Sequence, residues 1–237
     1  MRSFVIVALL AILLISVGCT CNVAGDRAYI NCHGDVTPCA DNAYNLGSPT
    51  SQWQNLYVYN ISPFTLESPL YNDLQIAMAN AKVPAASAPT WRYFQGVEVP
   101  AFSDTQVNVL YFTAQLTHTY LEGSDLEFHI HVAYPDANAG DIRWYFNYSW
   151  ANVDADFPAP TTVMLTASSP TTANRHQLIS IAPVIDGTGK LISSVLVCSI
   201  QRLGNAGEDT YPSEIYLVSG DFHYLVDTMG SHQLLVK

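Results

Sequence analysis

The stretch LEFHIHV, from Leu126 to Val132, alternates apolar and polar side chains without a break. The stretch IRWYFNYSW, from Ile142 to Trp150, repeats this pattern with aromatic residues. Successive side chains of a β-strand point to opposite faces, so a two-residue period predicts a strand with one buried face. We expect the first stretch to bury its four apolar side chains and to turn His129 and His131 away from the core.

The same kind of pattern continues through most of residues 91–237. Further strands are expected at residues 108–116, 175–185, 192–202, 215–219 and 222–227, with glycine-containing turns between them. The composition agrees, because 14 tyrosines and only 12% charged residues favour strands over helices. We therefore predict an all-β fold, an antiparallel β-sandwich or jelly roll of about eight strands.

The N-terminus carries an apolar run, FVIVALLAILLISV, from Phe4 to Val17. Its length lies between that of a signal peptide and that of a membrane-spanning helix. A cleaved signal, an uncleaved anchor helix and a lipoprotein signal ending at Cys19 all remain open. Ser16 to Cys19 resembles a bacterial lipobox, although Ser16 stands where leucine is usual. In each case we expect the N-terminus to be exported or membrane-associated.

Four segments follow from these patterns. Residues 1–21 form the signal or anchor, and residues 22–62 are rich in turns. Residues 63–90 form a connector, with a short helix predicted over Leu70–Lys82 from its apolar spacing and a Pro/Ala linker after it. Residues 91–237 form the β-sandwich domain.

Cysteine and asparagine positions suggest two covalent modifications. Four of the five cysteines lie within the first 39 residues, and among them Cys32 and Cys39 are the disulfide candidates. Cys198 lies in an apolar stretch and is expected to be an inert buried thiol. Asn147 begins an Asn-Tyr-Ser sequon, which makes it a glycosylation candidate in a eukaryotic host.

The net charge of −11 excludes a surface built to bind the phosphates of a nucleic acid. No nucleophile elbow, phosphate-binding loop or dinucleotide fingerprint occurs in the chain. We therefore expect neither nucleic-acid binding nor an organic cofactor, and we expect the protein not to be an enzyme.

Two stretches resemble phage proteins. The run DNAYNLGSPTSQWQNLYV, Asp41–Val58, resembles a repeat of phage tail fibres and tailspikes. The C-terminal domain is similar to a β-rich domain of predicted phage virion proteins, through the segments Phe128–Val132, Gly140–Trp144 and Asp221–Tyr224. These resemblances imply a structural protein of the virion surface, in a fibre, spike or capsid decoration.

The implied role is host attachment, with other virion proteins and a cell-surface glycan as partners and a homotrimer as the assembly. An alternative is an exported cell-surface lipoprotein or adhesin with a carbohydrate-binding β-sandwich.

A metal site is the sharpest chemical hypothesis. His129 and His131 stand at i and i+2 of one predicted strand, so both imidazoles can reach one ion. Gly123 followed by this pair resembles the opening of the cupin metal motif, and Gly220 with His223 echoes its second part. A cupin-like metal-binding protein with His129, His131 and His223 is therefore a further alternative. The resemblance to trimeric phage fibres implies instead an iron or other metal on the symmetry axis, and ordinary surface histidines remain the third option.

Overall fold

The computed structural model describes residues 28–30, 36–38, 50 and 68–237. The chain divides into two compact units, Met1–Ile61 and Ser62–Lys237. In the first unit, β1 (Ala28–Ile30) pairs with β2 (Val36–Pro38) in antiparallel fashion. The predicted anchor, Cys32, Cys39 and all of the fibre-like element except one residue lie outside the described residues. The described part of the chain contains no helix long and apolar enough to cross a bilayer.

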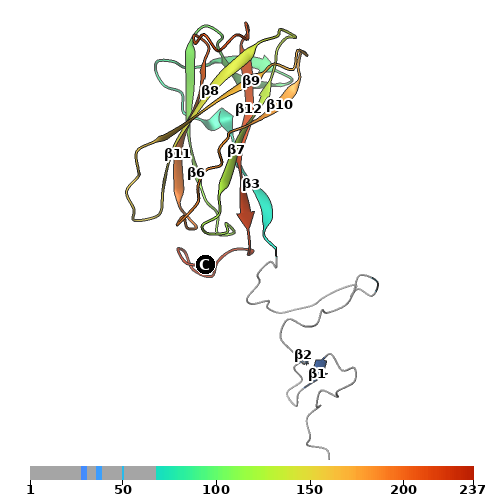
Figure 1. Cartoon of the computed structure of the whole chain (residues 1–237), viewed down its shortest axis with the longest axis vertical. Helices are drawn as coiled ribbons and strands as arrows, with labels where there is room; N and C mark the ends of the chain where they lie inside the picture. Colours follow the sequence, from blue (N-terminus) through green and yellow to red (C-terminus); the bar gives the residue numbers. More distant parts are fainter. Residues whose placement is uncertain (1–27, 31–35, 39–49, 51–67) are drawn as a thin grey trace, which may run out of the picture. The chain divides into compact units, whose positions relative to one another are not determined.

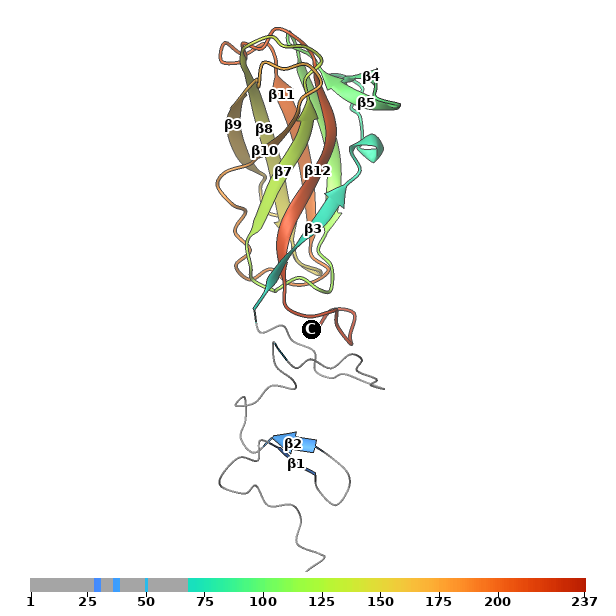
Figure 2. The ribbon, with the colours of Figure 1, turned by 90° about the vertical axis from the view of Figure 1, so that its right-hand side faces the viewer.

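The second unit is a sandwich of two antiparallel sheets (Figures 1 and 2). The six-stranded sheet contains, in spatial order, β10 (His176–Ser180), β7 (Leu126–Ala133), β12 (Ile215–Val226), β5 (Val97–Phe102) and β4 (Thr90–Phe94), with β3 (Leu70–Ile76) also paired to β12. The four-stranded sheet has the order β6 (Val107–Gln115), β11 (Val195–Leu203), β8 (Asp141–Ala151) and β9 (Thr161–Ser168). The predicted all-β antiparallel sandwich is confirmed, with ten strands where about eight were expected.

From β5 onward the chain changes sheets at every connection except the one between β8 and β9. Most paired strands are therefore distant in sequence, as in a jelly roll. The β4–β5 connection is local: Gln95 and Gly96 form a two-residue turn with φ angles of 47° and 103°. Such a turn needs positive φ at both positions, which glycine adopts without a steric penalty.

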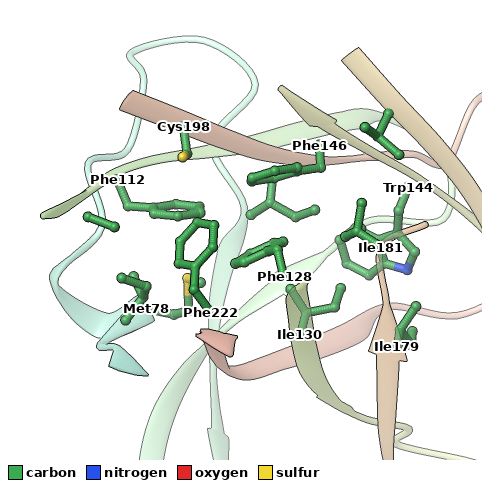
Figure 3. Close-up of a cluster of buried hydrophobic side chains, with 14 of the residues drawn as sticks. Met78, Phe112, Phe128, Ile130, Trp144, Phe146, Ile179, Ile181, Cys198 and Phe222 are labelled. Carbon is green, nitrogen blue, oxygen red and sulfur yellow. The ribbon is translucent and has the colours of Figure 1, made fainter. Parts of the chain in front are cut away.

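The core lies between the sheets and is rich in aromatic rings (Figure 3). Phe128 of β7 stacks on Phe146 of β8 with the ring centroids 4.2 Å apart, and Phe222 of β12 lies 4.7 Å from Phe128. The predicted inward face of β7 is confirmed, because its leucine, phenylalanine, isoleucine and valine are all at most 1% exposed. Burying one such side chain contributes about 1.5–3 kcal/mol, so these contacts hold the sheets together.

The helix predicted over Leu70–Lys82 is wrong. Residues Leu70–Ile76 form strand β3, and only Met78–Asn80 form a short 3-10 turn. The apolar spacing of four that suggested a helix also fits a strand, since four is a multiple of two. Pairing along the full length of β3 with β12 decides between the two periods. The sandwich therefore begins before the predicted boundary at residue 91.

Residues 215–227 were predicted as two strands but form the single strand β12, with an irregularity between Leu217 and Ser219. Gly220 does not end the strand. A methyl group built on Gly220 would lie 2.3 Å from Cε of Met78, so the end of the Met78 side chain would have to move to admit a larger residue at position 220. Strand β9 was not predicted.

Candidate metal centre

Six polar side chains gather on the face of the six-stranded sheet that points away from the core. Strand register sets this arrangement, because His129 of β7 lies directly opposite Asp221 of β12, and His223 lies opposite Asp73 of β3. Cross-strand partners share a face of a sheet. His131 shares this face because it lies two residues after His129 in β7. His176 of β10 shares it through the pairing of β10 with β7.

The tightest part of the cluster is a triad of two imidazoles and one carboxylate. Nε2 of His129 lies 2.8 Å from Oδ2 of Asp221, and Nε2 of His131 lies 3.1 Å from Oδ1 of the same carboxylate. All three ligand atoms lie within 4.8 Å of one another. Ligand atoms around a tetrahedral ion with bonds of about 2.1 Å are about 3.4 Å apart. The two nitrogen–oxygen distances would therefore have to lengthen by about 0.3–0.6 Å for an ion to enter.

The triad is largely closed to solvent. The side chains of His129 and Asp221 are 4% and 7% exposed, whereas that of His131 is 25% exposed. Burial lowers the pKa of His129 below its ordinary 6.5, and the nearby His223 and His131 act in the same direction, while Asp221 opposes them. His129 is therefore neutral at pH 7, which is the form that binds a metal ion.

His176 holds His131 in position. Nδ1 of His131 lies 2.8 Å from Nε2 of His176, on the side of the ring opposite Asp221. Without an ion, Nε2–H of His131 donates to Oδ1 of Asp221; with the proton on Nδ1 and donated to His176, Nε2 would instead offer its lone pair to an ion. Histidine ligands in metal sites commonly have such an outer partner, which fixes the tautomer and the ring orientation.

The three histidines predicted as ligands are brought together. His129 and His131 have ring centroids 5.3 Å apart, and His223 lies 4.2 Å from His129. The predicted orientation of His129 and His131 away from the core is confirmed, although His129 is buried rather than exposed. Cupin ligands point into the barrel, so the outer-face position disfavours the cupin alternative. The trimer with an axial iron stays a prediction.

The sequence interpretation missed Asp221 as a partner of the histidines, and it also missed Asp73 and His176. Asp73 lies in the strand that was predicted as a helix, where the polar residues Asp73 and Gln75 on either side of Leu74 were the only local indication of an outward position. His176 opens β10 with no second histidine nearby to mark it. Neither residue could be assigned to the cluster without the strand pairing.

The structure also shows the contacts of Asn147 and the burial of Cys198, the two other positions singled out in the sequence. Asn147 lies in β8, between β9 and β11, and its side-chain amide donates to Ser199 and accepts a hydrogen bond from Thr162. This engagement disfavours glycan attachment to the folded chain. Cys198 is buried, and burial raises the pKa of its thiol, as expected for an inert cysteine.

No protein-family model matches the chain, and no curated protein matches its sequence. Similar solved structures include three carbohydrate-binding modules. CBM35 from Cellvibrio japonicus Abf62 is 12% identical with a TM-score of 0.35, covering 65% of this chain and 92% of that one. CBM28, specific for non-crystalline cellulose, is 9% identical with a TM-score of 0.30 and coverages of 64% and 88%. TmCBM61, solved with β-1,4-galactotriose, is 10% identical with a TM-score of 0.29 and coverages of 66% and 88%. All three TM-scores lie below 0.5.

Proposed function

We propose that this chain is a metal-binding protein, with binding rather than catalysis as its role, and that His129, His131 and Asp221 hold a divalent transition-metal ion. One observation carries this proposal: a carboxylate that is almost completely buried faces the Nε2 atoms of two histidines from the neighbouring strand. Three convergent ligand atoms on two paired strands form a rigid frame for an ion.

The ligand types favour certain metals. Imidazole nitrogen suits zinc, copper, iron and nickel, whereas calcium and magnesium prefer sites made only of oxygen. Two histidines and one carboxylate occur in zinc sites and in non-haem iron sites. Zinc is the simplest probe, because it has no redox chemistry and adopts a tetrahedral geometry that three protein ligands and one water can complete.

Zinc titration of the full-length protein, followed by calorimetry, tests the proposal. We expect His131→Gln to weaken binding by more than the roughly 10–100-fold that is typical when only an outer partner of a metal ligand is lost. The matched control is His232→Gln, which removes an exposed histidine outside the cluster. Equal zinc affinity in the two variants would show that the centre does not bind the ion.

Carbohydrate binding is the second candidate function, and exposed aromatic side chains support it. Trp91 and Tyr93 are 38% and 76% exposed and project from the same face of β4. Residues two apart on a strand are separated by about 6.6–6.8 Å. Two flat rings at this spacing offer apolar surface with polar tips, which suits stacking against a sugar chain.

Affinity electrophoresis in gels containing soluble polysaccharides tests this second candidate. We expect retardation of the native protein that is lost in Trp91→Ala and Tyr93→Ala. Phe157→Ala is the control, because Phe157 is an exposed aromatic residue in the loop between β8 and β9. Equal migration of all three variants would count against sugar binding by Trp91 and Tyr93 on β4.

The virion-surface role stays a prediction, because the fibre-like element that suggests it lies almost wholly outside the described residues. A sandwich with a metal centre is compatible with attachment as well as with a cell-surface adhesin. Locating the protein in purified particles by mass spectrometry would test the prediction directly.

A further inference from the structure

The carboxylate of Asp221 faces the imidazoles of His129, His131 and His223, and His223 also contacts the carboxylate of Asp73. Oδ2 of Asp221 lies 3.6 Å from Nε2 of His223, in addition to its contact with His129. Nε2 of His223 in turn lies 2.8 Å from Oδ1 of Asp73. Asp73, Asp221 and His223 thus form a second triad whose ligand atoms lie within 4.8 Å of one another. The two triads have only Asp221 in common.

We infer that the centre is dinuclear: a second divalent ion binds Asp73 and His223, and the carboxylate of Asp221 bridges it to the first ion. This inference rests on the proposed metal-binding function. A carboxylate has two oxygens with about four lone-pair positions, so Asp221 can serve two ions at once. Bridged ions in protein sites are about 3.5–4 Å apart, a distance that one carboxylate spans.

Two divalent ions carry a charge of +4, which the surrounding carboxylates must partly balance. One divalent ion neutralises the two aspartates, and a second leaves a charge of +2 that needs compensation. Glu127 of β7 lies directly opposite His223 of β12 and therefore shares its face of the sheet. Glu127 therefore adds a third negative charge to this face of the sheet, on the strand next to His223. A bound hydroxide or an anionic ligand would supply the rest.

The two positions differ in their access to solvent. The side chains of His223 and Asp73 are 33% and 52% exposed, so the second triad is open where the first is closed. The ring of Tyr71 lies 6.2 Å from that of His223 and helps to line a hollow of about 350 Å³, together with Glu127 and Asp125. The second ion would therefore keep water ligands that an external oxygen-donor ligand could replace.

Zinc counting on full-length protein tests the inference. Each variant is equilibrated with excess zinc, freed of unbound metal and analysed by plasma mass spectrometry. We expect Asp73→Asn to hold one zinc ion fewer per chain than the native protein, and Asp221→Asn to hold two fewer. Asp156→Asn, an exposed aspartate in the loop after β8, is the control and should lose none. Because only differences are compared, zinc bound elsewhere in the chain cancels.

The outcomes separate the inference from the proposed function. A native count in Asp73→Asn with one zinc ion lost in Asp221→Asn would overturn the dinuclear centre and leave a single-ion site. A native count in Asp221→Asn would overturn both. If Asp221→Asn does not fold, the electron paramagnetic resonance of the copper-loaded native protein serves instead. Coupled copper pairs that become isolated ions in Asp73→Asn would support the inference, and isolated ions in both proteins would overturn it.

Discussion

Replacement of Arg202 by methionine should remove a large part of the stability of the sandwich. Arg202 projects from β11 into the interior, and its side chain is completely buried. Its guanidinium donates two hydrogen bonds to the carboxylate of Asp209, 2.9 and 2.7 Å long. It also donates to three backbone carbonyls, those of Phe102, Tyr211 and Ser213. Arg202 thereby ties the connection between β11 and β12 to β5.

The magnitude follows from what the substitution leaves behind. Arg202→Met leaves the completely buried carboxylate of Asp209 without its positively charged partner. The backbone N–H of Arg143 is then its remaining hydrogen-bond donor. Removing one partner of a buried ion pair typically costs about 3–5 kcal/mol. A native domain is stable by only about 5–15 kcal/mol, so the variant should be close to unfolding. Asp209→Asn should cost a comparable amount, because it removes the charge that the guanidinium needs.

Urea unfolding of the full-length protein in the presence of a chelator measures these free energies without a contribution from metal. The double variant Arg202→Met/Asp209→Asn should be destabilised by much less than the sum of the two single variants, because no buried charge is left unpaired. Arg92→Met is the control, since Arg92 forms the corresponding pair with Glu214 at the surface and should cost far less. Strictly additive effects, or equal losses in Arg202→Met and Arg92→Met, would refute the reasoning.

Three further predictions concern the core and the centre. Phe128→Ala should lower the free energy of unfolding by about 3–5 kcal/mol because it opens a cavity among stacked rings, and Leu178→Ala, at an exposed position of β10, should have little effect in the same urea titration. Zinc at about 100 times its dissociation constant should stabilise the folded state by about 2.7 kcal/mol, or roughly 5–11 °C in a thermal melt, and an unchanged melting temperature would contradict the site. Without metal, stability should be highest above about pH 6.5 and fall as the pH decreases, because the unfolded chain protonates His129 at its ordinary pKa of 6.5 whereas the folded chain resists protonation. His129→Gln should flatten this decline in unfolding experiments at successive pH values, and identical pH profiles would show that His129 is not its source.

The patterns that could be predicted from the sequence are local. The alternation in Leu126–Val132 and Ile142–Trp150 requires nothing beyond the geometry of one strand, so it indicates which side chains enter the core and which do not. The outward orientation of His129 and His131 follows in the same way. The helix predicted over Leu70–Lys82 failed because its spacing satisfied two periods at once, and no local property distinguishes them.

The composition of the candidate metal centre was decided by the tertiary structure. His131 and Asp221 are 90 positions apart in the chain and meet only because β7 pairs with β12 in one register. Asp73 and His176 join them through the pairing of β3 with β12 and of β10 with β7. A slip of one residue in any of these pairings would turn the ligands of that strand toward the core. The sequence by itself determined the strands and their two faces, while strand register, which depends on packing across the whole sandwich, determined which polar side chains share a site.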